Sequence, residues 1–540
     1  MHPLSHFRLL PLLIVLWLLS ACSVVQRPGD PATPAPSATM PASHVDAGAA
    51  VEPTVIPSST ATEQATIAPS PSPTPAPTET PPPLVMAVPP LWQQASERAT
   101  AQLTSWPGQI RATVSEAPTE LLTEGRAQLA LIATDDGYRV GQQPLAITVP
   151  FSSDWEQITL AEAQEIAANG HAFATVVPWT EIEPRQRALY VDGWHVTDPQ
   201  YPLQQQYALL AAPGYEPEAA ALAEHLKQHN PFNREVQLAA VGDVMLDRDL
   251  GTAIAAGDLA FPFAHVKSIF LESDLALANL ECALGDVGEA VDKSYTFRAP
   301  PSAARSLAAA GFDIVSLANN HAMDYGPAAL LQGIDLLRGS GIAVVGAGAD
   351  ARAARAPAFV TNKDLTIAFL GYANVPVEGR PPYFDTRSWT AGANSPGLAW
   401  ADSESIENDV NAARARAEHV VVLLHSGYEY VPGPSPEQRA AARAAIDAGA
   451  ALVIGHHAHI LQGVEFYGDG VIVYGLGNFA FTITGPPETA ILRVWLDERG
   501  VRQLDFVPAI IQASGQPRLA TADEASAIRR HIYALSAGLQ

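Results

Sequence analysis

Three histidines, His456, His457 and His459, follow one short apolar run of the sequence. The run Ala451–Ile454 before Gly455 predicts a buried strand, and glycine lets the backbone turn where that strand ends. Imidazole is the commonest neutral nitrogen ligand for transition metals, so the turn is a candidate metal-binding segment. The alternative is a polar loop that holds three histidines by coincidence. Partners elsewhere in the chain decide between the two.

Polar residues of the same kind follow several other apolar runs, each just after the expected end of a strand. Because the carboxyl ends of strands in α/β sheets form the edge where ligands bind, these side chains are expected to gather at one place. Each has a plain alternative: Asp243 as a helix cap, Asn320 in a left-handed turn, Glu281 as a surface charge. The whole set predicts a site. Its members beside the three histidines are Asp243, Asn279, Glu281, Asn319, Asn320, His321, His425 and Asn478.

From Glu235 onward, strand-like runs alternate with helix-like stretches, which predicts an α/β fold. The pattern Ser435-Pro436-Glu437-Gln438 resembles a capping box and predicts a helix that runs to Gly449. The late run Ala490–Trp495 suggests a partly antiparallel edge or a second sheet. The expected strands are Val236–Val241, Leu275–Leu280, Ile314–Leu317, Ala343–Val345, Thr366–Leu370, Val420–Leu424, Ala451–Ile454 and Val471–Tyr474, and the other expected helices are Pro300–Ala310, Pro327–Arg338 and Ser403–Glu418.

The stretch 91–231 is expected to be a smaller α/β domain. Its turn Pro150-Phe151-Ser152 and its late Tyr201-Pro202-Leu203 resemble periplasmic solute-binding proteins of the phosphate-binding kind. The expected strands are Leu129–Ala133 and Leu145–Val149, and the expected helices are Leu160–Asn169 and Pro217–Gln228. No phosphate-binding loop or ligand cluster occurs in this stretch of sequence. Trp194 and His195 are therefore interpreted as packing or surface residues.

The N-terminus has the features of a secretory signal. An apolar run that follows Arg8 is too short for a comfortable membrane span, and it ends in Leu19-Ser20-Ala21-Cys22, which resembles the processing box of bacterial lipoproteins. We therefore expect residues 1–22 to be a lipoprotein signal, with Cys22 acylated and the chain anchored to the bilayer outside the cytoplasm. A plain signal peptide or signal anchor with an incidental cysteine is the alternative. Residues 23–90, rich in Pro, Thr, Ser and Ala, are expected to be a disordered tether.

Composition narrows the possible partners. The chain has 540 residues, enough for two or three domains, and its 31 Lys and Arg against 56 Asp and Glu give a net charge of −25. Such a chain repels nucleic acid and anionic surfaces, so no nucleic-acid partner is expected. The two cysteines, Cys22 and Cys282, lie in regions of very different character, which argues against a structural disulfide. The oligomeric state is not readable from the sequence.

The polar motifs, in this order, resemble the CapA family, named for poly-γ-glutamate capsule synthesis. Ala458 departs from the proline that family members usually have in the histidine turn. The resemblance covers residues 235–482, with residues 483–540 expected to add strands and a helix. The matching motifs are Val241-Gly-Asp-Val-Met-Leu246, Ala278-Asn-Leu-Glu281, Phe297-Arg-Ala-Pro300, Ser316-Leu-Ala-Asn-Asn-His321, Asp324-Tyr-Gly326, His425-Ser-Gly-Tyr-Glu429, Gly455-His-His-Ala-His-Ile-Leu-Gln462 and Tyr474-Gly-Leu-Gly-Asn-Phe479.

The CapA family is in turn similar to calcineurin-like metallophosphoesterases. This resemblance implies a two-sheet β-sandwich flanked by helices, with one or two divalent metals, Mn, Fe or Zn, at the strand ends. By the same resemblance Asp243 binds the first metal, Glu281 bridges both, Asn320 binds the second, and His321 is the acid that protonates the leaving oxygen. The resemblance completes the ligand set with His425, His457 and His459.

One departure from the phosphoesterase pattern concerns the metal site directly. Their first motif is Asp-x-His, and Met245 stands in place of that histidine. Three alternatives stay open: a single metal, two metals bound asymmetrically, or recruitment of His456 as the missing ligand.

The remaining polar residues of these motifs are candidate contacts to substrate. Arg298 is a candidate clamp for an anion, with a surface arginine beside a proline turn as its alternative. Cys282 is interpreted as a small buried residue rather than a nucleophile. The other candidate contacts are Asn319, Glu429, His456 and Asn478.

Two functions remain. The first is a metal-dependent hydrolase or transferase that acts in the cell envelope on a phosphoester, a polyglutamate-like amide or a glycan-linked group. The second is a non-catalytic component of an exopolymer synthesis or export complex, in which the site binds polymer or stabilises the fold.

Overall fold

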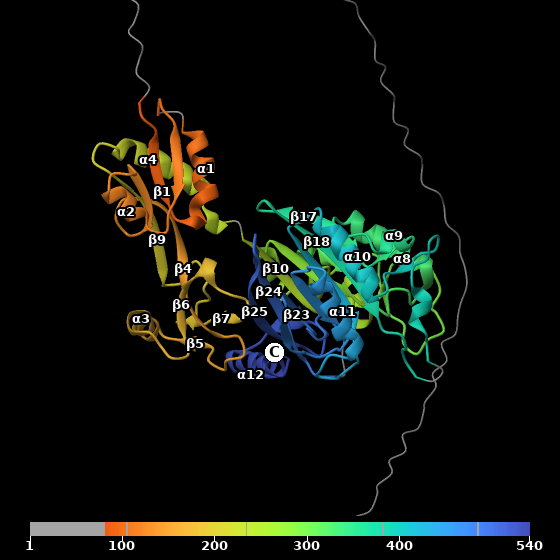
Figure 1. Cartoon of the computed structure of the whole chain (residues 1–540). Coiled ribbons are helices and arrows are strands. Elements are labelled where there is room, and N and C mark those ends of the chain that lie inside the picture. Colours follow the sequence, from red (N-terminus) through yellow and green to blue (C-terminus); the bar gives the residue numbers. More distant parts are fainter. Residues whose placement is uncertain (1–80, 104–105, 234, 381–382, 483–484, 540) are drawn as a thin grey trace, which may run out of the picture. The chain divides into compact units, whose positions relative to one another are not determined.

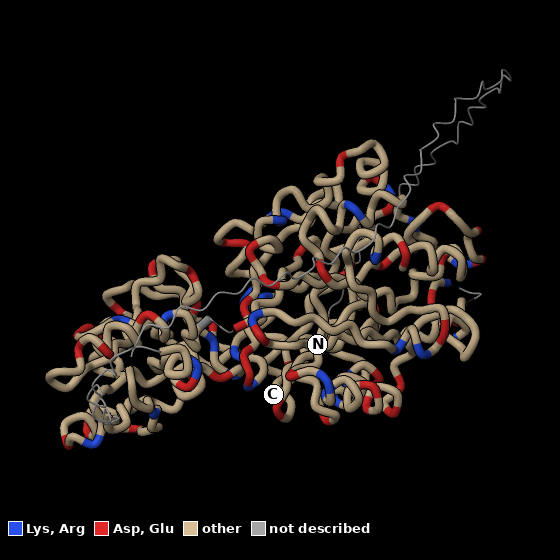
Figure 2. The backbone as a smooth tube through the Cα atoms, turned by 90° about the horizontal axis from the view of Figure 1, so that it is seen from above, with Lys and Arg blue, Asp and Glu red and all other residues tan. Residues whose placement is uncertain are grey.

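The computed structural model describes residues 81–539 apart from 104–105, 234, 381–382 and 483–484. All of them belong to one compact unit, Thr78–Gln540. The expected lipoprotein signal with Cys22 and most of the expected tether lie outside the described residues. The end of the expected tether is ordered instead, because its apolar residues Leu84–Val88 form a largely buried strand. Among the described helices, none combines the length and the hydropathy that a bilayer span requires. Lys and Arg are scattered along the described backbone in Figure 2, which fits the absence of a basic run from the sequence.

The C-terminal domain contains two sheets. The first has the order β15-β14-β11-β10-β24-β25-β26, with β10, β11, β14 and β15 parallel and the last three antiparallel. The second has the order β17-β18-β20-β21-β23-β22, with a parallel centre and antiparallel edges. The strands are β10 Val236–Val244, β11 Leu275–Leu280, β14 Ile314–Ser316, β15 Ala343–Val345, β17 Ala358–Asn362, β18 Leu365–Asn374, β20 His419–Ser426, β21 Leu452–His456, β22 Val464–Tyr467, β23 Gly470–Val473, β24 Glu488–Asp497, β25 Gly500–Ile511 and β26 Pro517–Leu519. Short pairs β12 Ala283–Leu284 with β13 Arg298–Ala299, and β16 Ala347–Gly348 with β19 Gly397–Leu398, complete it.

Strand alternation builds three apolar layers from these two sheets. On β10, Leu238 and Ala240 join a core that also holds Phe369 of the second sheet, so the sheets pack against each other. Ala239 and Val241 point the other way, into a core shared with helices. Side chains on a strand alternate between its faces, and both faces are covered here, which is why these strands are almost continuously apolar in the sequence.

Helices cover the outer face of each sheet (Figure 1). Helices α5 Arg248–Ala255, α6 Lys267–Glu272, α7 Ala303–Ala310 and α8 Gly326–Gly339 belong to the first sheet's outer layer, and α9 Ala351–Ala354, α10 Ser403–Arg414 and α11 Pro436–Asp447 to the second's. α11 begins with the predicted capping box at Ser435. α12 Ala522–Ala537 packs on β22 and β25. The expected α/β fold, a two-sheet sandwich flanked by helices, is confirmed.

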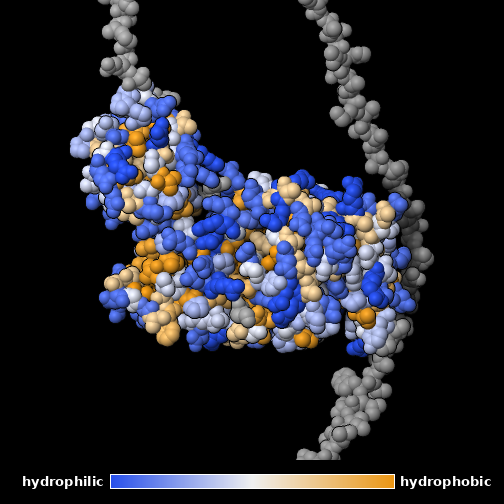
Figure 3. Space-filling model, in the orientation of Figure 1, coloured by the Kyte–Doolittle hydropathy of each residue, from blue (hydrophilic) through white to orange (hydrophobic). Residues whose placement is uncertain are grey.

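The region before this domain is a smaller α/β fold around the sheet β2-β1-β3-β9-β4-β6, with β7 paired to β4. Its strands are β1 Leu84–Val88, β2 Ile110–Val114, β3 Leu129–Ala133, β4 Tyr138–Pro150, β5 Gln157–Ile158, β6 Thr175–Pro178, β7 Gln186–Ala188, β8 Tyr190–Val191 and β9 Gln204–Ala211. Its helices are α1 Gln93–Gln102, α2 Pro118–Thr123, α3 Leu160–Asn169 and α4 Glu216–Gln228. Figure 3 shows apolar colour over the β6 part of this region. Phe173, which precedes β6 in the sequence, is 76% exposed.

The smaller region shares apolar packing with the sandwich. Trp495 of β24 belongs to one of its core clusters, and the buried ring of His195 stacks on Trp495 at 5.1 Å. Phe151 lies in the core between the two sheets of the sandwich. His195 is therefore a packing residue, as expected, and the neighbouring Trp194 is partly exposed.

Candidate metal centre

The site forms where a segment after β23 lies against the end of β10. Register shifts between Ala240 and Asp243 on β10, which bends the strand at that point. Asp243 donates its backbone N–H to the Gly477 carbonyl at 2.9 Å and accepts from the Phe479 N–H at 2.8 Å. A Cβ on Gly242 would lie 1.9 Å from the Gly477 oxygen, so only glycine permits this approach. The two sheets thereby bring their strand ends to one place.

The histidine turn is held in an unusual backbone conformation. His457 and His459 have φ of 88° and 57°, a region that non-glycine residues seldom occupy. The His457 N–H donates to the Asp243 carboxylate at 3.1 Å, which ties this turn to β10. Such conformations persist where the surrounding structure enforces them, and they concentrate at functional sites.

Two buried asparagines form hydrogen bonds next to the metal centre, one to the Asp243 carboxylate and the other to the first asparagine. Asn279 donates to Asp243 Oδ1 at 2.8 Å and lies 3.1 Å from His425 Nδ1. Asn319 donates to the Asn279 side chain and to the Leu280 carbonyl, and it accepts from the His321 N–H. The side chain of Asn319, a predicted substrate contact, is thus used in hydrogen bonds within the protein.

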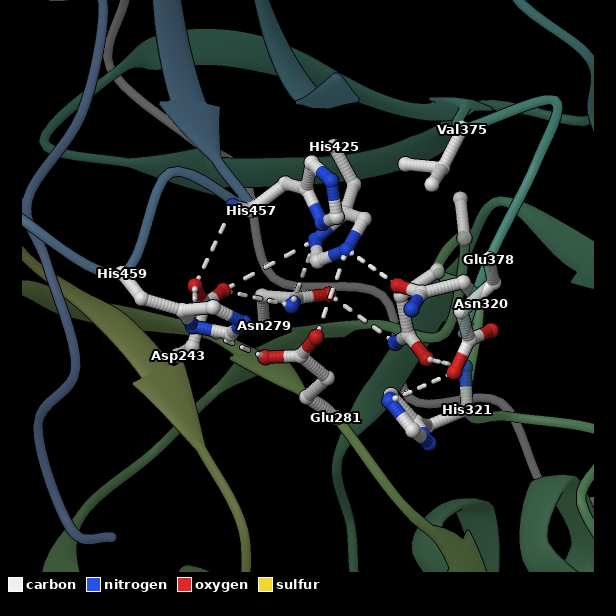
Figure 4. A network of polar contacts seen from close by, with 12 residues as sticks. Asp243, Asn279, Glu281, Asn320, His321, Val375, Glu378, His425, His457 and His459 are labelled. Atoms are coloured by element: carbon white, nitrogen blue, oxygen red, sulfur yellow. Dashed lines mark hydrogen bonds and ion pairs between the residues drawn. The ribbon is translucent and has the colours of Figure 1, made fainter. Parts of the chain in front are cut away.

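Carboxylates and imidazoles converge inside this frame (Figure 4). His425 Nε2 lies 2.7 Å from Asn320 Oδ1 and 3.4 Å from Glu281 Oε1. His459 Nδ1 lies 3.4 Å from Asp243 Oδ2 and 3.8 Å from Glu281 Oε2. The structure therefore brings together all six sequence-predicted metal ligands, which are Asp243, Glu281, Asn320, His425, His457 and His459.

Several polar atoms at the centre have no hydrogen-bond partner although they are buried. They include both carboxylate oxygens of Glu281, the amide nitrogen of Asn320 and Nδ1 of His457. Burying such atoms without partners costs free energy, which a cation between them would offset. Among the described residues, three sets of donors have their ligand atoms within 4.8 Å of one another, and two of them contain Glu281: Asp243 with Glu281 and His459, and Glu281 with His425 and His457. The mixture of carboxylate oxygen and imidazole nitrogen fits a divalent transition metal.

The protonation states of the cluster reflect its burial. Burial and the Asp243 charge raise the pKa of Glu281 well above its ordinary value. Burial lowers the pKa of His457 to about 3 and that of His425 well below its ordinary value, so both are neutral and ready to bind metal. Although burial opposes it, the charge of Glu281 and the contact with Asp243 raise the pKa of His459 to about 10. A metal that binds here must displace that proton.

His321 lies beside the cluster, between two carboxylates. Its Nδ1 is 2.8 Å from Asp324 Oδ2, and its Nε2 is 3.3 Å from Glu378 Oε1. The buried Lys293 ammonium forms ion pairs of 2.7 Å with both Asp324 and Glu378 and donates to the Asn320 carbonyl. The sequence motifs contained Asp324, whereas Lys293 lies in an irregular segment and Glu378 lies in the loop after β18, beyond the end of the strand that the sequence predicted. Sequence reasoning missed these two residues.

A cavity of about 770 Å³ opens above the cluster. His321, His457 and His459 line its floor, and the predicted contacts Glu429 and Asn478 line it as well. Its lining also includes Arg248, Tyr295, Phe297, Arg380, Tyr428 and Tyr430, none of which was a predicted substrate contact. This volume exceeds the needs of a metal and one reacting group, because cavities of this size hold whole small molecules.

Three other predicted residues are not in the cavity lining. Arg298 stacks on Tyr325, with 4.1 Å between guanidinium and ring centre. His456 is buried with Nε2 3.2 Å from the Val241 carbonyl. Cys282 is a free, fully buried thiol, and burial raises its pKa to about 12, as expected for a packing residue rather than a nucleophile.

Solved structures resemble the chain only loosely. A hypothetical protein from Thermus thermophilus aligns with 51% of this chain and 98% of its own, at 15% identity and a TM-score of 0.32. A novel phosphatase from Mycoplasma pneumoniae aligns with 51% of this chain and 94% of its own, at 11% identity and a TM-score of 0.34. An ABC-type phosphate transport receptor from Vibrio cholerae covers 27% of this chain and 96% of its own, at 11% identity and a TM-score of 0.22.

Sequence relatives are much closer. The family described as "Bacterial capsule synthesis protein PGA_cap" matches residues 237–483. The "Capsule biosynthesis protein CapA" of Bacillus anthracis is 30% identical over 314 residues, 56% of this chain and 73% of that protein. The "PGA biosynthesis protein CapA" of Bacillus subtilis (strain 168) is 31% identical over 273 residues, 50% of this chain and 70% of that protein. With the motifs in order and most of each relative covered, this chain belongs to the CapA family of bacterial capsule synthesis proteins.

Proposed function

We propose that this chain is a membrane-anchored lipoprotein outside the cytoplasm, and that its C-terminal domain is a metal-dependent hydrolase of phosphoester or related bonds. Its reaction would serve the synthesis or processing of a capsule-type, poly-glutamate-like polymer. The names of the family relatives support the part in capsule polymer synthesis. The anchoring is supported by the sequence around Cys22.

One observation carries the enzymatic part of the proposal. Glu281 is fully buried, neither of its carboxylate oxygens has a hydrogen-bond partner, and it faces His425 and His459 below an open cavity. A structural carboxyl has partners for its oxygens, because burial of an ionised carboxylate costs several kcal/mol unless it is compensated, and this cost raises the pKa of Glu281. A divalent metal held by this set is the compensation that the chemistry of the donors favours.

The residues at the site would have distinct roles in the reaction. Asp243, Glu281 and His459 would hold one ion, and Glu281, Asn320, His425 and His457 a second. A bound divalent ion supplies Lewis-acid chemistry. His321 would donate a proton from Nε2 to the leaving oxygen, while Asp324 at Nδ1 fixes the orientation of the ring. Phe297, whose ring lies 4.5 Å from that of His321, covers the imidazole on one face.

The test compares two histidines on the same strand of the full-length chain. His425 and His419 both lie on β20, near opposite ends, and both are buried. The wild-type chain is expected to hydrolyse bis-p-nitrophenyl phosphate, to lose this activity with a chelator and to regain it with Mn²⁺. His425→Ala should lose about 10³-fold in turnover, as expected when several kcal/mol of metal-dependent stabilisation are removed.

His419→Ala, which removes a contact to the Asp497 carbonyl far from the site, should keep its turnover. Absence of chelator-sensitive turnover in a wild-type chain that binds metal would contradict the hydrolase. The polymer-binding, non-catalytic component described above would then be the better account.

A further inference from the structure

The Asp243 half of the metal centre lacks a fourth protein ligand. Met245, which stands where the phosphoesterase pattern has histidine, is fully buried in the apolar core, and its sulfur accepts the Asp247 N–H at 3.3 Å. The nitrogen of His456 contacts the Val241 carbonyl instead, and His456 belongs to none of the ligand groups among the described residues. Asp243, Glu281 and His459 therefore supply three donors to this half.

The turn after β20 brings one more carboxylate to the same place. Gly427 and Tyr430 have φ of 122° and 59°, so the chain doubles back directly after the strand. The Tyr430 N–H then donates to the Ala458 carbonyl at 2.8 Å, which pins this turn to the histidine turn. Glu429 lies between these fixed points. Its carboxylate and the ring nitrogens of His457 and His459 have ligand atoms within 4.8 Å of one another.

The surroundings of the Glu429 carboxylate fit those of a metal ligand. Among the described residues, no hydrogen bond or ion pair engages its carboxylate, although it lines the cavity beside the two histidines. Exposed acidic groups are common without metal, so exposure alone decides nothing. The second observation is the buried Nδ1 of His457, which has no partner and belongs to the same group of donors.

We propose that Glu429 supplies the metal ligand that Met245 does not. Its carboxylate is grouped with His457 and His459 rather than with Asp243 and Glu281, so it would join the ion of the Asp243 half through their shared neighbour His459. This inference rests on the metal centre of the proposed function and adds an asymmetry to it. The Glu429 half has three carboxylates and one imidazole, whereas the other half has Glu281, Asn320 and two imidazoles. Carboxylate oxygens suit Mn²⁺ and Mg²⁺, and imidazoles suit Zn²⁺ and Fe²⁺. The half of the centre that contains Glu429 is therefore expected to prefer Mn²⁺. Because the Glu429 side chain is exposed, this half is also the one open to solvent.

The test counts metal rather than turnover. Full-length wild-type chain, Glu429→Gln, and the matched control Glu437→Gln, which alters an exposed glutamate in the first turn of α11, are titrated with Mn²⁺ by calorimetry. Bound metal is counted by mass spectrometry, and coupled Mn²⁺ pairs are observed by electron paramagnetic resonance. Wild type and Glu437→Gln should bind two ions. Glu429→Gln should lose the coupled signal and bind one of the two ions at least about 10-fold more weakly. Unchanged stoichiometry and affinity in Glu429→Gln would overturn the inference.

The two proposals fail in different ways. A wild-type chain that binds two ions and hydrolyses nothing, with Glu429→Gln reduced to one tight ion, keeps Glu429 as a ligand and removes the hydrolase. Chelator-sensitive turnover that falls in Glu429→Gln without any change in metal binding keeps the hydrolase. Glu429 would then be the substrate contact that the sequence suggested.

Discussion

Glu281 and Glu465 are two buried glutamates of the same domain, and their surroundings differ in kind. Glu465 on β22 is 3% exposed, accepts the Tyr474 hydroxyl at 2.5 Å and pairs with the Arg443 guanidinium. Glu281 is fully buried, and neither carboxylate oxygen has a hydrogen-bond partner. One carboxylate has its counter charge within the chain, whereas the other faces imidazoles and a second carboxylate.

The difference separates a structural charge from a functional one. A buried carboxylate with an arginine and a hydroxyl completes a fold, because its charge and its lone pairs are compensated by protein groups. A buried carboxyl without them either stays protonated or is compensated by a group from outside the chain. Both residues are glutamates near histidine or arginine in the sequence. Their partners in three dimensions distinguish them, since Glu465 has protein partners for its charge and the oxygens of Glu281 have no hydrogen-bond partner.

The largest effect is expected from neutralising the two glutamates in turn. Glu281→Gln should abolish the gain in thermal stability that metal gives to the wild type, which amounts to about 2.7 kcal/mol when free metal is 100 times its Kd. Without metal, Glu281→Gln should be as stable as the wild type or more so, since burial raises the pKa of Glu281 well above its ordinary value and the amide resembles the neutral carboxyl without its cost of ionisation. Glu465→Gln should lose about 1–3 kcal/mol in both conditions and keep the metal effect. Denaturant unfolding with and without Mn²⁺ measures all of these. If metal still stabilised Glu281→Gln, the proposed difference between Glu281 and Glu465 would be contradicted.

A smaller effect is expected from Asp324, whose buried carboxylate is paired like that of Glu465 but acts on the site. Asp324→Asn should lower kcat by about 10–100-fold, as for residues that orient a catalytic group, with KM and metal content unchanged. Asp313→Asn is the control. Asp313 accepts the N–H of Ala276, at the end of β11 opposite to Glu281 and the site. Steady-state kinetics with metal analysis distinguishes the outcomes. A rise in KM or loss of metal in Asp324→Asn would show a general structural role instead.

The pH dependence of stability should differ between the metal-free and the metal-loaded chain. The folded pKa of His459 is raised from 6.5 to about 10, so its stabilisation is complete below pH 6.5 and is lost as pH rises through about 10. The raised pKa of Glu281 has the same sign, from 4.5 upward. The lowered pKa values of Asp243, His425 and His457 add no slope above about pH 6.5.

The metal-free chain should therefore lose up to about 1.4 kcal/mol per pH unit for each proton released between pH 6.5 and 10. The metal-loaded chain should lose less, because the metal has already displaced those protons. Thermal unfolding across this range measures both slopes. Parallel slopes for the two forms would argue against metal binding at His459.

The smallest effect is expected at Cys282, which follows Glu281 directly in the sequence. Its thiol is fully buried and packs in the apolar core, so Cys282→Ala should leave turnover unchanged and cost on the order of 1 kcal/mol of stability. A loss of turnover greater than tenfold, at unchanged metal content, would assign the thiol a chemical role.

Much of the sandwich could be predicted because its strands are buried on both faces and its site residues follow them. β11, β15 and α11 start at the expected residues, and each predicted ligand lies at a strand end. Elements with mixed composition were missed, such as α5, whose buried Leu250 and Ile254 stand among polar and small residues. The expected helix from Ser403 to Glu418 ends at Arg414, since the Glu418 N–H pairs with the Thr366 carbonyl beside β20.

The sequence predicted the residues that meet at the candidate metal centre, but it did not predict two of the residues that surround His321. Lys293 and Glu378 come from irregular segments 85 residues apart in sequence, and only the fold places both against Asp324 or His321. The role of Met245 and the position of Glu429 likewise depend on how two turns pack, which no pattern in one segment encodes. The anchoring at Cys22 and the substrate stay predictions from the sequence and the family.

The most direct test of this account is the metal content of the full-length chain. After purification, exposure to Mn²⁺ and removal of free metal, wild type is expected to retain at least one divalent ion per chain by mass spectrometry, and Glu465→Gln should retain the same amount. Glu281→Gln should retain none. Equal metal content in all three chains, or none in the wild type, would contradict the proposal that the Glu281 carboxylate, whose oxygens have no hydrogen-bond partner, is a metal ligand.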